Sequence, residues 1–278
     1  MRLLLCAPPP LILALAAAVL GVAVPGARGH GDVHEAIAAL TGELEAKPGN
    51  AKLLFERASL YSTYEHWTEA LADLDRVRAL EPANAAEPAL RANILRRSGQ
   101  PAEARGLQEA ILKAHPEQAL VRWDYAQTLA ALDDTTAALR ELDTLITAAE
   151  HPQPDVIALR LRLAEKVDAA AALTWLDGFL TKHALPVFQE EALRLELKLG
   201  RQEAALGRMD SMIAVAPRPE FLQLRKAELL ATSGDKAGAA TAARAAQAAI
   251  ARLPAHVRST RACAALEAKA DLFLSPAP

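Results

Sequence analysis

Residues 51–84 read AKLLFERASLYSTYEHWTEALADLDRVRALEPAN, and this stretch decides the fold. Two small residues, Ala58 and Ala70, are followed by Pro82 at equal intervals. We interpret the stretch as a helical hairpin whose helices cross at the two alanines, because a larger side chain there would force the backbones apart. The proline ends the second helix, since it lacks an N–H donor and restricts the residue before it.

The same pattern recurs along the chain. Pro48, Pro82 and Pro116 are evenly spaced, with similar residues around them, and fixed-period self-similarity is the mark of a repeat protein. Small residues recur at the expected crossings as Ala36, Ala58, Ala70, Ala92, Ala104, Ala126, Ala138, Ala192, Ala204, Ala227 and Ala239. The match weakens between Asp155 and Pro186, where Lys166-Val167-Asp168 leaves a very short connection between two helices.

This pattern resembles the tetratricopeptide-repeat (TPR) family, whose motif places small residues, aromatic residues, a large apolar residue and a proline at fixed positions. In residues 51–84 the aromatic positions are taken by Tyr61 and Trp67 and the large apolar one by Leu74. In the next repeat the large apolar position holds Gln108, a weaker core residue. The resemblance implies an all-α fold, a right-handed α-solenoid of TPR helical hairpins with capping helices at both ends. We expect about 14 helices and no strand.

The repeat pattern also predicts the organisation of the chain. Residues 30–50 form an N-terminal capping helix that begins at Asp32 with a capping box to Glu35. Residues 255–278 form a C-terminal capping helix, over 256–274, and a tail. Between them, residues 51–254 divide into six repeats at 51–84, 85–118, 119–154, 155–186, 187–219 and 220–254.

Residues 1–29 are interpreted as a secretory signal peptide. Arg2 precedes an apolar run from Leu11 to Val24, and Ala27-Arg28-Gly29 places small residues suitably for cleavage before His30. Cleavage after Gly26 is the nearest alternative. An uncleaved anchor is disfavoured, because a run of about 14 residues is short for a bilayer span. We therefore expect an exported protein, in the periplasm of a Gram-negative bacterium, with no stable membrane span after cleavage.

Composition and motifs exclude several classes of function. The formal net charge of −3 disfavours nucleic-acid binding, and Cys263 is the one cysteine after the signal peptide, so no intramolecular disulfide is expected. The chain contains no phosphate-binding glycine loop, nucleophile elbow or zinc motif, so we expect no enzyme and no cofactor. The acidic pairs Asp133-Asp134 and Glu190-Glu191 are interpreted as a turn cap and a solvated helix face.

An alternative function comes from the expected mature N-terminus. Cleavage before His30 would leave its α-amine and imidazole close to the imidazole of His34. Amine and imidazole nitrogens suit copper(II), which favours tetragonal nitrogen and oxygen sites. The alternative hypothesis is thus a copper- or metal-handling protein that uses His30 and His34.

The leading hypothesis follows from the family resemblance, which implies a groove lined by the first helix of each repeat. The residues at groove positions that we expect to contact a partner are Phe55, Ser59, Asn93, Arg96, Arg97, Trp123 and Gln127. They combine aromatic side chains with a basic centre, and Trp and Arg dominate many interfaces. Adjacent arginines also pair with carboxylates. The sequence therefore predicts a scaffold that binds a peptide or protein in its groove.

Overall fold

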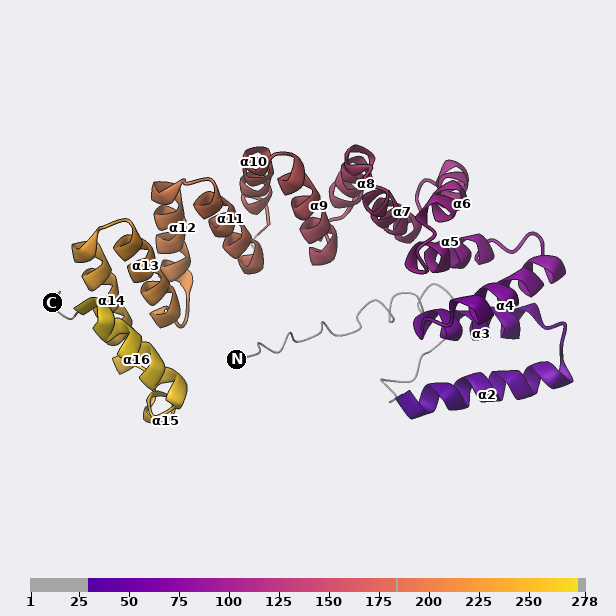
Figure 1. Ribbon diagram of the computed structural model, residues 1–278, viewed down its shortest axis with the longest axis horizontal. Coiled ribbons are helices and arrows are strands. Elements are labelled where there is room, and N and C mark those ends of the chain that lie inside the picture. The colour runs from indigo at the N-terminus through magenta and orange to yellow at the C-terminus, as the bar shows by residue number, and fades with distance from the viewer. Residues whose placement is uncertain (1–29, 184, 275–278) are drawn as a thin grey trace. The chain divides into compact units, whose positions relative to one another are not determined.

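The computed structural model describes residues 30–183 and 185–274, and every regular element in those ranges is an α-helix (Figure 1). The expected all-α fold is confirmed. The predicted signal peptide lies outside the described residues. Contacts within the chain define two compact units that meet between Val156 and Ile157, here called the N-terminal unit and the C-terminal unit.

The described residues contain 15 helices, close to the number expected from the repeats. The N-terminal unit contains α2 (His30–Ala46), α3 (Ala51–Thr63), α4 (Trp67–Leu80), α5 (Glu87–Arg97), α6 (Pro101–Ala114), α7 (Ala119–Ala131) and α8 (Thr135–Ala148). The boundary between the units falls within α9 (Pro154–Val167). The C-terminal unit continues with α10 (Ala169–Leu180), α11 (Pro186–Lys198), α12 (Gln202–Val215), α13 (Glu220–Thr232), α14 (Lys236–Ala251), α15 (Ala255–Arg258) and α16 (Arg261–Leu274).

Consecutive helices pack as hairpins, as the sequence predicts. In the N-terminal unit α3 packs on α4, α5 on α6 and α7 on α8, and each hairpin packs on the next. In the C-terminal unit α11 packs on α12 and α13 on α14. The end helices α2 and α16 pack on α3 and α14. Sequential hairpins of this kind form an α-solenoid, in which each repeat buries its apolar face on its neighbours.

The ends of the solenoid differ from expectation in detail. Helix α2 begins at His30, two residues before the predicted cap Asp32. The predicted closing helix is divided by Ser259 and Thr260 into α15 and α16. The Thr260 hydroxyl accepts a hydrogen bond from the backbone N–H of Cys263 at 3.3 Å, so a new helix N-terminus forms there.

The crossing alanines of the first three repeats are buried as predicted. Their exposed fractions are 1% or less at Ala58, Ala70, Ala92, Ala104, Ala126 and Ala138. In the fifth repeat Ala192 is buried, but the structure buries Ala205 and leaves the predicted Ala204 exposed. The second helix of that hairpin is therefore shifted by one residue from the predicted register.

The turn between the two helices of a hairpin explains the shift. Glu65, Gly99, Asp133, Gly200 and Gly234 have positive φ angles, between 57° and 87°, and each lies in such a turn. In every case the buried alanine of the second helix follows five residues later, so Gly200 is followed by Ala205. One extra residue between Ala192 and Gly200 moves the second helix along by one position.

The side chain of Arg57 joins the two helices of the first hairpin to each other and to the capping helix. The guanidinium of Arg57 on α3 donates from Nε and Nη2 to the two carboxylate oxygens of Asp73 on α4, at 2.7 and 2.8 Å. Its Nη1 donates to the hydroxyl of Thr41 on α2 at 2.9 Å. Because Asp73 is only 3% exposed, its carboxylate has lost most of its contact with water. The bidentate pairing with Arg57 compensates for this loss.

Candidate functional site

The first helices of three consecutive repeats lie side by side in the N-terminal unit. Helix α5 contacts both α3 and α7, in addition to its own hairpin partner. The residues predicted from the groove positions all lie on these three helices. We call the surface that they form the first-helix face; it consists of Phe55, Ser59, Asn93, Arg96, Arg97, Trp123 and Gln127.

Asp124, an acidic residue that was not among the predicted site residues, contacts two residues of this face. Asp124 on α7 accepts a hydrogen bond from Asn93 Nδ2 at 2.7 Å and another from Arg96 Nη2 at 3.2 Å, one on each carboxylate oxygen. The Arg96 side chain is 17% exposed and that of Asp124 is 21% exposed. Asp124 therefore joins α5 to α7 and balances the charge of Arg96.

Arg97 is also held within the chain. Its Nη1 donates to the backbone carbonyl of Ser62 at 3.1 Å, and its Nη2 lies 3.7 Å from the carboxylate of Glu65. The guanidinium also lies over the indole ring of Trp67. Each arginine of the basic centre that the sequence suggested thus has one acidic neighbour, Asp124 for Arg96 and Glu65 for Arg97.

The two aromatic residues of the first-helix face differ in their surroundings. Phe55 is half-buried and packs against two clusters of core residues, which include Leu44 and Ala58, so it holds neighbouring helices together. Trp123 is half-buried on α7, and its carbonyl accepts a hydrogen bond of 3.4 Å from Gln127 Nε2 one turn later. Both rings are thus half-buried, and Phe55 has a packing role within the unit.

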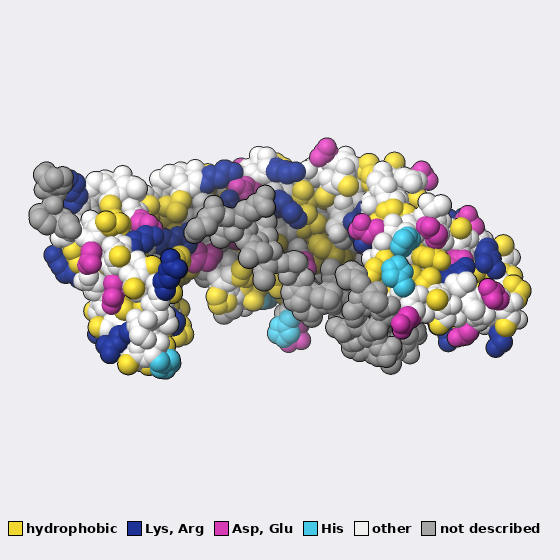
Figure 2. All heavy atoms as spheres, turned by 60° about the horizontal axis from the view of Figure 1, so that its bottom comes forward, with side chains coloured by type: hydrophobic (Ala, Val, Ile, Leu, Met, Phe, Trp, Pro, Cys, Tyr) yellow, Lys and Arg dark blue, Asp and Glu magenta, His cyan; other side chains and the backbone are white. Residues whose placement is uncertain are grey.

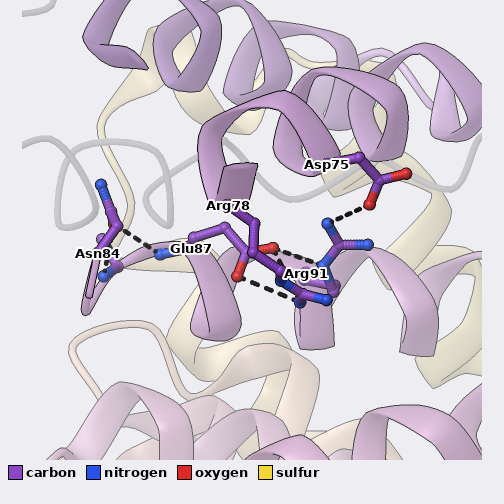
Figure 3. Close-up of polar contacts among 6 residues, drawn as sticks. Asp75, Arg78, Asn84, Glu87 and Arg91 are labelled. Atoms are coloured by element: carbon purple, nitrogen blue, oxygen red, sulfur yellow. Dashed lines mark hydrogen bonds and ion pairs between the residues drawn. The ribbon is translucent and has the colours of Figure 1, made fainter. Parts of the chain in front are cut away.

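A second network fixes the start of α5, and with it the position of the first-helix face (Figure 3). Glu87 is 3% exposed and accepts hydrogen bonds from Arg78 on α4 and from Arg91 one turn along α5. Arg91 also donates to Asp75 on α4 at 2.7 Å. The side chain of Asn84 accepts from the backbone N–H of Glu87 at 3.0 Å. A buried carboxylate with two arginine partners resists displacement, so α5 is anchored to α4.

The acidic pairs weighed as catalytic groups are engaged in structural contacts. The Asp134 side chain caps α8 by accepting from the backbone N–H of Ala137 at 3.2 Å. Glu190 pairs with Arg225, and Glu191 pairs with Arg194 at 2.8 Å. These contacts agree with the interpretation of the pairs as a cap and a helix face.

The C-terminal unit contains a polar hollow of about 330 Å³ between α11 and α12. Its lining residues are Gln189, Glu196, Ala204, Gly207, Arg208 and Ser211. Arg208 donates to Gln189 Oε1 and to both carboxylate oxygens of Glu196, which is 4% exposed. It also donates to Asp177 on α10. Arg208 thus holds three helices together, and its donors point at partners in the chain.

The metal prediction remains a prediction. His34 is exposed on α2, and the side chain of His30 lies outside the described residues. Among the side chains that the structure describes, no group of three or more His, Cys, Asp and Glu residues could hold a metal ion. Within the described helices, none is long and apolar enough to cross a membrane.

Comparison with known proteins identifies the fold. No protein-family model and no curated protein sequence matches the chain. A TPR repeat-containing protein from Cytophaga hutchinsonii, of which the C-terminal part is solved, is similar over 88% of this chain and 95% of its own, with 15% identity and a TM-score of 0.62. A tetratricopeptide repeat protein from Parabacteroides merdae is similar over 88% and 93%, with 14% identity and a TM-score of 0.51. The chain therefore has the fold of TPR proteins, as the resemblance implied.

Proposed function

We propose that this protein is a scaffold that binds a peptide or protein partner on the first-helix face of its N-terminal unit. The observation that supports the proposal is that α5 contacts both α3 and α7, so the first helices of three repeats are neighbours. TPR proteins are generally non-catalytic scaffolds, and this chain has their fold. Buried ion pairs at Glu87 and Asp73 fix the helices that carry the face, which lowers the cost of ordering it on binding.

The proposal assigns different roles to the residues of the face. Trp123 supplies apolar area, because a half-buried indole loses water when a partner covers it. Asn93, Ser59 and Gln127 supply hydrogen-bonding groups. Phe55 and Arg97 act mainly by holding the helices in place, since they pack against neighbouring helices of the same unit.

We also propose that the protein is exported and works in the periplasm of a Gram-negative bacterium. The support is the apolar run of residues 11–24, followed by the small residues at a suitable cleavage site. Sequencing the N-terminus of the mature protein tests this proposal and bears on the metal hypothesis. A first residue other than His30 would remove the amine–imidazole set on which copper binding by His30 and His34 depends.

Crosslinking in an envelope extract, followed by capture of the full chain, tests the binding function. The wild type should recover a partner that Trp123→Ala recovers much less. Arg244→Ala, a change at an exposed residue on α14, should behave as wild type and serves as the matched control. If Trp123→Ala stays folded and recovers the same partner in the same amount, the first-helix face is not the binding surface.

A further inference from the structure

The segments that follow α10, α12 and α14 in the C-terminal unit are basic. They contain lysine and arginine but no acidic residue, and their cations are Lys182, Arg218 and Arg252. In the N-terminal unit the segments that follow α2, α4, α6 and α8 are acidic on balance. Their charged residues, histidine aside, are Lys47, Glu81, Glu117 and Glu150. The excess of positive charge between helices is therefore particular to the C-terminal unit.

The three basic segments share one edge of the unit. Because short turns join α11 to α12 and α13 to α14, the helices of each pair run antiparallel, and the end of the second lies beside the start of the first. The segments therefore follow one another along the lower edge of this unit in Figure 1. Figure 2 turns this edge toward the viewer and shows Lys and Arg side chains together with hydrophobic ones on the unit.

Large apolar side chains adjoin these segments. Val187 and Phe221 are the second residues of α11 and α13, and Val215 is the last residue of α12. All three are more than half exposed. Exposed apolar side chains that gather in one region often mark a binding surface. We call this surface the connection edge; it consists of the three basic segments with Val187, Val215 and Phe221.

The cations of the connection edge present positive charge to the solvent. Among the described residues, neither Lys182 nor Arg252 forms an ion pair with an acidic side chain, and both are exposed. Arg218 pairs with Glu220 through Nε and Nη2, at 2.7 and 2.6 Å. Glu220 is buried, whereas the Arg218 side chain is more than half exposed, so the guanidinium and not the carboxylate faces outward.

A lipid surface with anionic headgroups fits this combination of side chains. Lysine and arginine are attracted to headgroup phosphates, while aliphatic and aromatic side chains enter the boundary between headgroups and acyl chains. A protein partner would need a preformed surface to receive side chains that project from several helix ends. A bilayer adapts to them, and three successive segments along one edge can meet it together.

We infer that the connection edge docks on an anionic lipid surface. Phe221 and Val215 enter the headgroup boundary, and the cations of the three segments lie at the phosphates. The connection edge belongs to the C-terminal unit, and the first-helix face belongs to the N-terminal unit. Lipid docking is thus a second activity beside the proposed peptide binding, and either can fail without the other.

The test follows a tryptophan introduced at the edge of the full chain. Phe221→Trp places an indole on the connection edge, and Leu120→Trp places one at the matching second residue of α7, next to an acidic segment. Emission is recorded with phosphatidylcholine vesicles whose acyl chains are brominated, with or without phosphatidylglycerol, because bromine quenches an indole that reaches the acyl chains. The wild-type emission under the same conditions is subtracted. Both variants carry the apolar run of residues 11–24, so vesicle binding through that run affects them equally.

The two positions should respond differently. Phe221→Trp should lose emission on vesicles that contain phosphatidylglycerol and keep it on phosphatidylcholine alone. High salt should restore the emission, because it screens the attraction of the cations to the headgroups. Leu120→Trp should keep its emission on both kinds of vesicle.

Neutralising two cations of the edge measures their share of the binding. Lys182→Gln together with Arg252→Gln, made in the Phe221→Trp chain, should raise the vesicle concentration needed for half of the loss by about tenfold or more. Lys47→Gln together with Lys113→Gln, at exposed residues of the N-terminal unit, removes the same charge and should leave that concentration unchanged.

Three results would overturn the inference: equal loss of emission at positions 120 and 221, loss at 221 that does not depend on phosphatidylglycerol, or no loss at 221. If no vesicle quenches the indole but the Lys182→Gln and Arg252→Gln pair loses a partner in the crosslinking capture, the connection edge is a protein interface and the inference is wrong. None of these results bears on the first-helix face, which Trp123→Ala tests.

Discussion

The guanidinium carbon of Arg97 lies 4.8 Å from the centroid of the indole ring of Trp67. Arg97 is the last residue of α5 and Trp67 the first of α4, so the contact joins two repeats. The same side chain donates to the carbonyl of Ser62 near the end of α3. An arginine that the sequence placed in a binding groove is thus part of the packing between the first two hairpins.

Arg97→Ala should therefore destabilise the protein. Loss of the cation–π contact and of the hydrogen bond should lower the free energy of unfolding by about 1 kcal/mol. Arg97→Lys keeps the charge but loses the flat guanidinium over the ring, so an intermediate effect is expected. Urea unfolding of both variants beside Arg244→Ala measures these differences. An Arg97→Ala midpoint equal to that of the control would show that the contact adds nothing to stability.

The register of the fifth repeat gives a sharper test of packing. Ala205 is fully buried and Ala204 is exposed on the same helix, α12. Ala205→Leu should overpack the helix crossing and reduce stability by about 1–3 kcal/mol, whereas Ala204→Leu should change it by less than about 0.5 kcal/mol. Ala104→Leu, at the fully buried crossing of the second repeat, should resemble Ala205→Leu. Thermal melting ranks the three variants, and a larger loss at Ala204 than at Ala205 would restore the register inferred from spacing alone.

The sequence predicts the hairpins because a crossing tolerates only small residues, which leaves a periodic trace. Ala58, Ala70, Ala92 and Ala104 could be found by counting. The fixed spacing wrongly predicted Ala204 as the buried crossing residue, because this repeat contains one additional residue. Gly200 could have indicated the correct register. A turn position with positive φ favours glycine, and this turn determines where the next helix starts.

The charge partners on the first-helix face could not be predicted in the same way. The groove positions identified Arg96 and Asn93, but Asp124 lies one repeat away and next to a groove position, not on one. Which of many acids meets a given arginine depends on how two helices are rotated against each other, and periodicity does not encode that rotation. The structure is therefore needed to find the acidic neighbours of the predicted basic centre.

Stability should depend on pH through Glu165 on α9. Hydrogen bonds from Arg194 and Lys198 on α11 lower the pKa of this carboxyl from 4.5 to about 2. A carboxyl whose pKa is lower in the folded state than in the unfolded state stabilises the fold at pH values above its unfolded-state pKa. This contribution is lost as the pH falls from about 4.5 to about 2. Glu165→Gln should therefore be less stable than the wild type at pH 7, and the difference should shrink over that range.

Urea unfolding at several pH values measures the effect, with Glu203→Gln, at an exposed residue of α12, as the control. Because Arg194 and Lys198 are about half exposed, solvent screens the pairing, and the difference at pH 7 should be small and should decrease further in high salt. A gap between wild type and Glu165→Gln that is constant from pH 7 to pH 2 would mean that the contacts of Glu165 do not depend on its charge.

Gln108 on α6 occupies the position that Leu74 and Leu142 fill in the neighbouring repeats. It is 1% exposed, and among the described residues neither its Oε1 nor its Nε2 has a hydrogen-bond partner. Burying an amide without partners costs about 1–3 kcal/mol. Gln108→Leu removes the amide at nearly constant volume, so this variant should be more stable than the wild type by about that amount, as measured by urea unfolding. Gln108→Ala removes the amide too but leaves a cavity, whose cost offsets the gain, so it should be less stable than Gln108→Leu. A Gln108→Leu variant less stable than the wild type would contradict this prediction, and would indicate either overpacking by leucine or an amide that a buried water molecule satisfies.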